Sequence, residues 1–461
     1  MSNKPVVVND IHSKLNPTVV GNISSPETES DLLEVIEKSK RIAVCGGRHS
    51  MGGQQFLSDE TLVDMSRLNM VSVNADSCIA RIGAGAQWPE INEALLEAQN
   101  GNQFRLTYRQ KQTGGDRLSI GGSLSSNIHT RGLSFAPFVE DIEAFRMVLA
   151  NGEVVTVSRT ENSELFSLAV GGYGLFGVVS YIDLRLVRRH KLRREVEIRR
   201  SEGLMSAIDD KVKEGYEYGD FQFAIDAKSE DFLDNGVFAC YLPVSDETPI
   251  GNSKISVPRR AWHELVYMAH EKKSEAFRLY CDFYKKSSGQ IYWSDTHQMT
   301  PYLDHYHEKL DRRLGAKCAG SEMITELYVR REDFEVFMSA TRDYLRAENA
   351  NVIYGTVRVV EVDSETFLAW AKERWACIII NLHVDHDEMG LERAKSQFRG
   401  LIDIAQQFGG SYYLTYHPWA SHEQILKSYP QIPEFFAKKV AYDPLLKFAS
   451  NWYDLMSRLI Q

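Results

Sequence analysis

Glycine-rich loops are the part of the sequence that most directly suggests chemistry. The first loop follows the apolar run at 41–45 and contains Gly46, Gly47, Arg48, His49 and Ser50. Glycines let the backbone pass close to a ligand, and successive N–H groups in such a turn form an anion-binding concavity. The loop therefore predicts a site where the backbone lies against an anionic ligand.

Three similar loops follow within the same part of the chain, at 82–85, 119–129 and 171–179. Any one of them could be a tight turn and no more. Together with the first loop they lie within residues 45–179, and a large, extended cofactor explains this concentration better than four unrelated turns.

The fourth loop contains a misleading motif. Gly172, Gly174 and Gly177 match G-x-G-x-x-G, but a Rossmann fingerprint follows a strand and opens a helix. Here the helix-like segment 161–170 precedes the glycines and the strand-like segment 178–187 follows them. The order is inverted, so we reject a Rossmann site. The sequence has no G-x-x-x-x-G-K-[ST] motif either.

Helix-like and strand-like segments alternate around these loops. Apolar periodicity and capping signals predict helices at 31–40 and 88–98 and strands at 41–45 and 78–83. Asn151-Gly152 within 143–157 predicts a hairpin with a type I′ turn. We expect a mixed α+β domain over residues 1–190.

The composition changes after residue 200, where aromatic residues and long polar segments become common. We expect helices laid over an antiparallel sheet in a second domain, 191–410, followed by a C-terminal segment, 411–461. The segments that predict it are helices at 260–286 and 301–313 and strands at 237–244, 324–329, 356–362 and 377–384. The basic stretch 185–200 fits either an anion or RNA patch or an exposed strand, and we favour the strand.

Charge and hydropathy limit the classes of function. The chain has 53 Lys+Arg against 63 Asp+Glu, a net charge of −10, which argues against a nucleic-acid partner. Mean hydropathy is −0.32, and no apolar run approaches the ~20 residues of a membrane span. We see no signal peptide and expect a cytoplasmic protein.

Cysteines and histidines give no metal signature. The six cysteines are widely spaced without a C-x-x-C pair, so we expect reduced thiols. His383 and His386, with Asp385 and Asp387, invite a metal interpretation, but they follow a buried strand. We expect a strand-end cluster that faces water and predict no metal site.

Taken in order, the four loops resemble those of the vanillyl-alcohol oxidase / p-cresol methylhydroxylase superfamily of FAD-dependent oxidoreductases. The sugar, polyol and lactone oxidases and decaprenylphosphoryl-ribose oxidase are the most similar branch. The resemblance covers the first ~190 residues well, the last ~50 moderately and the middle weakly. It implies a two-subdomain FAD-binding domain with an antiparallel-sheet cap covered by helices, and a C-terminal return at 442–448 to the flavin domain.

The resemblance also implies residue roles at the cofactor. Residues 46–50 correspond to the pyrophosphate loop, and His49 stands where many members bond covalently to the flavin 8α-methyl group. The neutral imidazole is the form with the required nucleophilic nitrogen. Bicovalent members have a second anchor, a cysteine, where this chain reads 114–118 without one. The further FAD-binding residues implied are Ser119, Gly122, Ser126, Asn127, His129, Val178, Val179 and Tyr413.

The implied reaction is hydride transfer from a CH–OH carbon of a sugar, polyol, lactone or related alcohol to flavin N5. A base takes the hydroxyl proton, and Tyr416 or His417 stands where relatives place a catalytic lysine. Arg358 aligns with an arginine that faces the flavin, although a pair with Glu361 is an equal alternative. Thr356 replaces a glutamate of that branch.

Several alternatives stay open from the sequence. The electron acceptor is molecular oxygen or another compound, so oxidase and dehydrogenase are not separated. A non-catalytic binding protein of the same fold is disfavoured by the intact loops and His49, as is an NADPH-dependent reductase. Segment 292–298 fits a substrate loop and plain packing between helices equally well.

Overall fold

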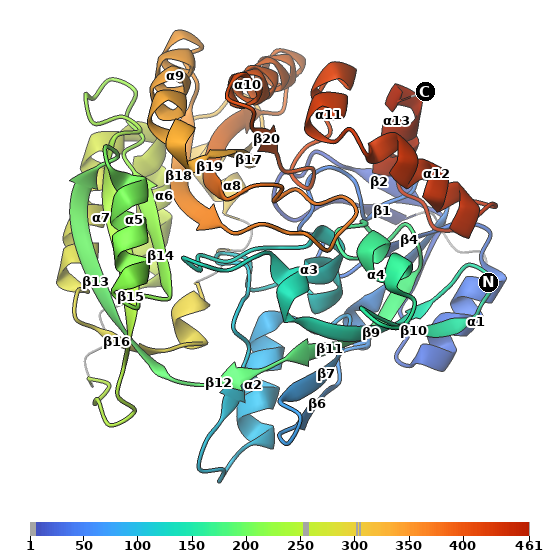
Figure 1. Ribbon diagram of the computed structural model, residues 1–461. Helices are drawn as coiled ribbons and strands as arrows, with labels where there is room; N and C mark the ends of the chain where they lie inside the picture. Colours follow the sequence, from blue (N-terminus) through green and yellow to red (C-terminus); the bar gives the residue numbers. More distant parts are fainter. Residues whose placement is uncertain (1–5, 252–257, 301–302, 304–305, 461) are drawn as a thin grey trace.

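The first elements of the chain form where local sequence signals are strongest. The computed structural model describes residues 6–251, 258–300, 303 and 306–460 (Figure 1). Thr28 and Asp31 form a reciprocal capping box at the start of α1 (Glu29–Lys38). Pro89 occupies the first turn of α2 (Trp88–Ala98). Both helices agree with the sequence-based prediction to within two residues.

A three-stranded parallel sheet carries the first glycine loop. Its strands are β3 (Asn22–Ser24), β5 (Thr61–Asp64) and β4 (Ile42–Cys45), with β5 in the centre. The loop begins where β4 ends, so its backbone is fixed to a buried strand. A two-stranded antiparallel sheet precedes it, formed by β1 (Val6–Val8) and β2 (Thr18–Val20).

A five-stranded antiparallel sheet holds the other three loops. Its order is β10-β9-β11-β7-β6. The strands are β6 (Val71–Asn74), β7 (Ile79–Gly83), β9 (Ile142–Val148), β10 (Val154–Ser158) and β11 (Val178–Arg185). The elements between and beside them are η1 (Met65–Arg67), β8 (Leu106–Thr107), α3 (Ile120–Ser126), η2 (Phe138–Asp141), α4 (Ser163–Ala169) and β12 (Val187–Arg188). The fourth loop lies between α4 and β11, which confirms the inverted order that excludes a Rossmann motif.

The β9–β10 hairpin forms as predicted, but its turn is of another type. Type I′ needs positive φ at both central residues, and only Gly152 has it, with φ of 83°. The N–H of Gly152 donates to the carbonyl of Leu149, and the Asn151 side chain accepts from the N–H of Glu153. The asparagine thus closes a longer turn through its side chain instead of adopting the left-handed conformation.

The second domain contains an eight-stranded antiparallel sheet, in the order β16-β13-β15-β14-β18-β19-β17-β20. Its strands are β13 (Lys191–Arg200), β14 (Tyr218–Phe223), β15 (Asn235–Val244), β16 (Ile291–Trp293), β17 (Gly320–Arg330), β18 (Val352–Val360), β19 (Trp375–Asp385) and β20 (Ser411–Tyr412). The basic stretch 185–200 runs through the end of β11 into β13, which pairs on both sides. It is a strand, as expected, but an internal one.

Helices cover both faces of this sheet (Figure 1). They are α5 (Leu204–Lys213), α6 (Arg259–Glu271), α7 (Lys273–Lys286), α8 (His307–Leu314), α9 (Phe334–Ala347) and α10 (Glu388–Gln407). The helix predicted over 260–286 is two helices, because Lys272 leaves the helical conformation with φ −141° and ψ 53°. Of the helix predicted at 301–313, residues 307–313 are helical, and positions 301, 302, 304 and 305 lie outside the described residues.

The C-terminal segment returns to the first domain. The N–H of Ile42 in β4 donates to the carbonyl of Lys447, and the N–H of Ala449 donates to the carbonyl of Ile42. The remaining elements are η3 (Thr296–Gln298), η4 (Arg331–Asp333), α11 (His422–Ser428), α12 (Ile432–Tyr442) and α13 (Asn451–Ile460). Because β20 still belongs to the eight-stranded sheet, the return begins after residue 412, slightly later than the expected boundary.

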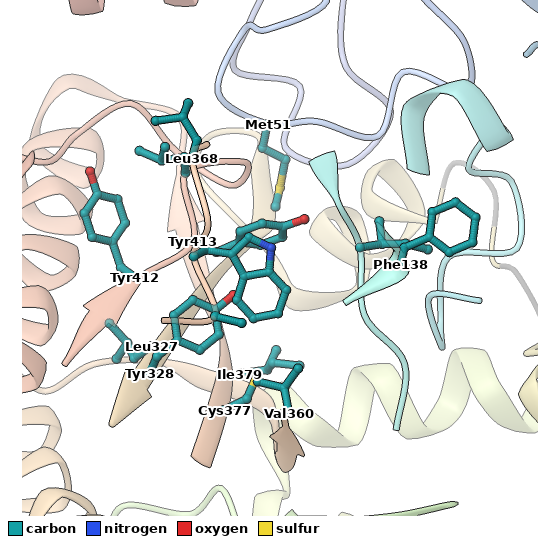
Figure 2. Packing of buried hydrophobic residues seen from close by; sticks show 14 of the residues in the cluster. Met51, Phe138, Leu327, Tyr328, Val360, Leu368, Cys377, Ile379, Tyr412 and Tyr413 are labelled. Carbon is teal, nitrogen blue, oxygen red and sulfur yellow. The ribbon is translucent and has the colours of Figure 1, made fainter. Parts of the chain in front are cut away.

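The hydrophobic core is continuous between the two domains. Figure 2 shows Met51, from the end of the first loop, above Tyr413, which follows β20; both are buried. Tyr328 of β17 stacks on Trp370 beneath them, with ring centroids 4.8 Å apart. This packing fixes the first loop relative to the large sheet. Among the described helices, none has the length and apolar character needed to cross a bilayer.

Candidate active site

A cavity of about 660 Å³ lies between the glycine loops and the eight-stranded sheet. One wall is backbone from the first, third and fourth loops. The opposite wall consists of side chains from β14, β17, β18 and β19, together with α6 and α7. The first and second domains therefore both contribute to one site.

The first loop and the third loop pack against each other through glycine. A Cβ on Gly46 would lie 1.9 Å from Ser119 Oγ, and one on Gly47 would lie 2.0 Å from the carbonyl of Arg117. Arg48 adopts a positive φ of 56°, and its Nη2 donates to Asp64 Oδ2 at 2.9 Å. All five residues 46–50 line the cavity. The close packing at Gly46 and Gly47 leaves no space for side chains there, so backbone forms that part of the wall.

His49 is held by a second histidine that the sequence analysis missed. His12 Nε2 lies 2.7 Å from His49 Nδ1, and both rings line the cavity. Burial lowers the pKa of His12 to about 4, and burial followed by the charge of His12 holds the pKa of His49 well below its usual value. Both imidazoles are therefore neutral near pH 7, the nucleophilic state. No local signal in the segment around His12 indicates this role.

The third loop contributes fewer direct contacts than expected. Ser119 caps α3 by accepting from the N–H of Gly122 at 3.2 Å, and Ser119, Gly122 and Ser126 line the cavity. Asn127 does not line it: its side chain donates to Asp363 Oδ2 at 2.9 Å while its φ is 47°.

His129 likewise lies outside the cavity lining. Its Nε2 lies 2.7 Å from Glu326 Oε1, and its Nδ1 lies 3.0 Å from the carbonyl of Thr130. Asn127 and His129 thus hold the end of the third loop against the second domain. In this structure both residues position the loop, and their direct contact with a cofactor stays a prediction.

The fourth loop closes the far end of the cavity. A Cβ on Gly177 would lie 2.7 Å from the carbonyl of Val148, so β11 starts in close contact with β9. Val178 and Val179 then line the cavity with apolar side chains. Tyr413 reaches the same wall from the other domain and donates to the carbonyl of Ser126 at 2.5 Å. An apolar end next to tight backbone fits a flat aromatic group.

Alternate residues of the large sheet give the opposite wall its polarity. Side chains two residues apart in a strand share a face, and Asp220 and Gln222 of β14 lie beside Thr356 and Arg358 of β18 on the cavity side. We call the set Asp220, Gln222, Glu322, Thr356, Arg358 and Asn381 the polar sheet face. The sequence signal for the first two is an Asp-x-Gln alternation inside a strand that is buried throughout.

Arg358 is the most informative member of the polar sheet face. It is 5% exposed, and its Nε and Nη1 have no hydrogen-bond partner within the described part of the chain. Glu361, the expected surface partner, instead accepts from Arg331 and Arg374. A buried, uncompensated guanidinium is unfavourable, so the geometry fits a ligand that supplies oxygen acceptors.

Tyr416 and His417 separate in the structure. Tyr416 lines the cavity, and burial, with the charge of Glu326 next, raises its pKa well above its usual value. It therefore stays protonated near pH 7 and can donate a hydrogen bond, which favours a role as a donor over one as a base.

His417 points away from the cavity. It lies against the rings of Phe398, Tyr412 and Trp419, and burial lowers its pKa to about 3. Tyr416 lies in a bend that follows a turn at 414–415, and only Tyr416 of these two residues lines the cavity. We therefore withdraw His417 as a catalytic residue.

Aromatic residues that sequence reasoning left undecided also face the cavity. Tyr280 and Tyr284 of α7 line it, and Tyr280 donates to Gln222 Oε1 at 2.7 Å. In segment 292–298, Tyr292, Thr296 and His297 line the cavity, whereas Asp295 pairs with Arg189 away from it. That segment therefore serves both the cavity and the packing.

The basic strand β13 contributes one residue to the cavity. Arg194 is 8% exposed, and its Nε and Nη2 donate to the hydroxyl of Tyr241 at 3.0 and 2.7 Å. The prediction of an exposed strand over 185–200 did not identify Arg194 as a cavity residue.

The residues present fit a flavin nucleotide. Backbone that only glycine permits forms one wall, and a neutral histidine stands beside it. Arg358 faces this wall from the other domain, and its Nε and Nη1 have no acceptor among the residues that the structure describes. Buried Asn381 Oδ1, which also lacks a partner among residues described here, adds an acceptor for a ring N–H.

Comparison with known proteins agrees with this fit. Residues 20–158 match the FAD binding domain family. The chain is 31% identical over 197 residues to an uncharacterized oxidoreductase in the fasciation locus of Rhodococcoides fascians, which covers 42% of each chain. It is 30% identical over 177 residues to an FAD-dependent monooxygenase of Arthrobotrys oligospora, 37% of this chain and 32% of that one.

A third relative is an FAD-linked oxidoreductase of Aspergillus ruber, 30% identical over 180 residues, which are 38% of this chain and 34% of that protein. The chain thus spans between about a third and two fifths of the length of these curated relatives. The similarity is to FAD-dependent oxidoreductases and does not identify one branch of them. The family match lies in the N-terminal part of the chain, where residues 20–158 are similar to FAD binding domains.

Proposed function

We propose that this protein is an FAD-dependent oxidoreductase that oxidises a CH–OH group of a sugar, polyol, lactone or related alcohol. The observation that carries the proposal is the pairing of the two cavity walls. The wall of tightly packed glycine backbone contains His49, and the polar sheet face lies opposite. That face presents Arg358, whose Nε and Nη1 have no hydrogen-bond partner in the described part of the chain. A cofactor held by the first wall would meet a hydroxyl compound held by the second.

His49 is the proposed covalent attachment point for the flavin. Its low pKa keeps the ring neutral, and the 2.7 Å contact with His12 fixes the orientation of the imidazole. His12 is therefore a positioning residue for the linkage. The absence of a cysteine from 114–118 limits the attachment to one bond.

Bound FAD would supply hydride acceptance at N5, and the chain would supply position and proton handling. Arg358 and Tyr416 are hydrogen-bond donors at the cavity and would orient the oxygen of the substrate. Of the two carboxylates among the described lining residues, Glu322 is surrounded by histidines, whereas Asp220 accepts from Arg131 and Gln222. Asp220 retains acceptor capacity and is the proposed base for the hydroxyl proton.

The substrate class follows from the chemistry of the second wall. The polar sheet face offers both donors and acceptors, and Tyr280, Tyr284 and Tyr292 add flat apolar surface beside it. Hydroxyl-rich compounds match such an arrangement because their oxygens pair with the polar groups while their C–H faces pack on rings.

A visible spectrum of the purified protein, taken before and after acid precipitation, tests the cofactor part. Yellow colour that stays in the pellet supports a covalent flavin, and the His49→Ala variant should then release its flavin to the supernatant. Colour released from the parent protein overturns the linkage but keeps the flavoprotein. A colourless protein that FAD cannot reconstitute overturns the proposal as a whole.

Anaerobic bleaching by a panel of polyols, sugars and lactones tests the reaction. Bleaching by a member of the panel, with an Asp220→Asn variant at least ~100-fold slower, is expected. Reoxidation by air would define an oxidase, and reoxidation by a dye alone would define a dehydrogenase. NADPH-driven bleaching without response to any alcohol would contradict the assignment.

A further inference from the structure

Four side chains from four separate elements converge at one end of the cavity. They are His270 of α6, His307 of α8, Glu322 of β17 and His383 of β19, and we call them the imidazole–carboxylate cluster. Glu322 and His307 line the cavity, and Glu322 belongs to the polar sheet face. Nothing in the proposed function uses these histidines.

The distances within the cluster have the spacing of metal ligands. Glu322 Oε1 lies 3.2 Å from His270 Nε2 and 3.3 Å from His383 Nδ1, and Glu322 Oε2 lies 3.2 Å from His307 Nδ1. One ligand atom each from His270, Glu322 and His383 lie within 4.8 Å of one another. Ligands bound tetrahedrally at about 2.1 Å from zinc lie about 3.4 Å apart.

Other histidine–carboxylate pairs of this chain are closer and simpler. His129 Nε2 lies 2.7 Å from Glu326 Oε1, and His190 Nε2 lies 2.8 Å from Glu217 Oε2. Those are direct hydrogen bonds with no room for an ion between the two atoms. His307 Nδ1, by contrast, has no hydrogen-bond partner of suitable geometry among residues described here. In the cluster one carboxylate is shared by three imidazoles at longer distances, of which the contacts of His270 and His383 are hydrogen bonds of 3.2 and 3.3 Å.

The surroundings orient the ligand atoms. The Tyr306 hydroxyl donates to Glu322 Oε2, which fixes the carboxylate. Asp385 Oδ1 lies 3.6 Å from His383 Nε2, on the side of the ring opposite Glu322. A carboxylate that accepts from one ring nitrogen, here Nε2, keeps the proton on that nitrogen. The other ring nitrogen, here Nδ1, is then unprotonated and able to bind a metal ion.

We propose that the imidazole–carboxylate cluster is a binding site for a divalent first-row metal ion, with zinc as the best match. His270, Glu322 and His383 are the core ligands, and His307 is the fourth. Imidazole nitrogens with one carboxylate are a typical zinc ligand set, whereas calcium and magnesium prefer oxygen-only sites. An ion there could exchange His307 for an oxygen atom of a molecule in the cavity, because both His307 and Glu322 border that space.

The sequence pattern at residues 383–387 does not predict this site, because it contains only one of the four proposed ligands, His383. His383 was expected to face water, but its side chain is 12% exposed and faces Glu322. His386 bonds to Ser321 instead and does not join the cluster. The other three ligands, Glu322, His307 and His270, are 61, 76 and 113 residues away along the chain.

Metal content and a cobalt spectrum test the site without reference to flavin or activity. The full-length protein, stripped with a chelator and dialysed against zinc, should retain about one zinc per chain by mass spectrometry of the metal. Cobalt(II) added to the stripped protein should give intense visible d–d bands typical of four-coordinate N/O ligation, and zinc should abolish them. Stripped protein that binds neither ion, or binds cobalt with only weak octahedral bands, overturns the proposal.

Variants separate a metal site from a structural ion-pair network. Glu322→Gln and His383→Gln should each weaken cobalt binding at least ~100-fold, and Asp385→Asn about 10-fold. His190→Gln is the matched control, since it breaks a His–Glu pair at the starts of β13 and β14 and should leave cobalt binding unchanged. Equal binding in Glu322→Gln and the parent would overturn the assignment. If the variants fail to fold, the stoichiometry and spectrum of the parent decide.

Discussion

The two walls of the cavity are built in different ways. The wall of the first domain is backbone, shaped by glycines that leave no space for a Cβ, as at Gly46 and Gly47. The wall of the second domain is a row of side chains, in which Arg358 and Asp220 present charge from adjacent strands. A wall of backbone suits a cofactor that many related proteins have in common. A wall of side chains distinguishes one substrate from another.

This difference separates two kinds of mutational effect. Changes in the first wall should remove the cofactor, whereas changes in the second should keep the cofactor and impair turnover. The four substitutions below test that division, and they are ordered from the largest expected effect to the smallest.

Gly47→Ala should have the largest effect. Its Cβ would lie 2.0 Å from the backbone carbonyl of Arg117, which cannot move without displacing the third loop. We expect flavin content to fall more than ~10-fold and the free energy of unfolding to fall by about 3 kcal/mol. Absorbance at the flavin band and thermal melting measure both. Gly251→Ala, where a Cβ meets open space, is the control, and equal flavin content in the two variants would contradict the backbone-wall model.

Arg358→Met should abolish most activity and leave the flavin in place. The methionine fills the space, but the donors that face the cavity are lost. We expect kcat/KM to fall about 10³-fold with unchanged flavin content. Arg374→Met removes an exposed arginine paired with Glu361 and serves as the control. Loss of flavin from the Arg358→Met variant would show that Arg358 holds the cofactor and not the substrate.

Tyr416→Phe should have a moderate effect. The hydroxyl stays protonated because burial raises its pKa, so its removal deletes one hydrogen-bond donor and no base. We expect kcat/KM to fall about 10-fold and its pH profile to keep the same shape. Tyr442→Phe, which removes an exposed hydroxyl bonded to Glu164, provides the comparison. A profile that loses its alkaline or acidic limb would show that Tyr416 transfers a proton.

His417→Phe should leave activity near pH 7 unchanged and alter acid stability. Because burial lowers the pKa of His417 to about 3, the unfolded chain binds this proton more readily than the folded one below pH 6.5. Stability therefore falls as the pH falls from 6.5 towards 3, by about 2 kcal/mol at pH 5. Phenylalanine removes that slope, which urea unfolding at pH 7 and pH 5 will measure. An unchanged slope would contradict the neutral, buried state of His417.

The first wall can be predicted from the sequence better than the second, because the first is local backbone and the second is a set of side chains from distant strands. Loops of glycine have local signatures, so the first wall, the helix and strand segments around it, and the rejection of a Rossmann motif could all be predicted from residues 41–179. The turn at Gly152 and the break at Lys272 could not, because tertiary packing selects among turns and helix ends of similar energy. Side chains such as His12, Asp220 and Arg194 meet their partners only through contacts between distant segments, and no local pattern specifies those partners.

The return of the chain at 447–451 has a consequence for the order of events during synthesis. Ile42 is bonded to Lys447 and Ala449, and the N–H of Asn451 donates to the carbonyl of Phe56 at 2.7 Å. Strand β4 therefore has one open edge until more than four hundred further residues have left the ribosome. Contacts so distant along the chain form slowly, and the loop that follows β4 should acquire its final shape last. Cofactor loading is then expected only after residues 447–451 have been synthesised, with an exposed edge that chaperones can recognise in the meantime.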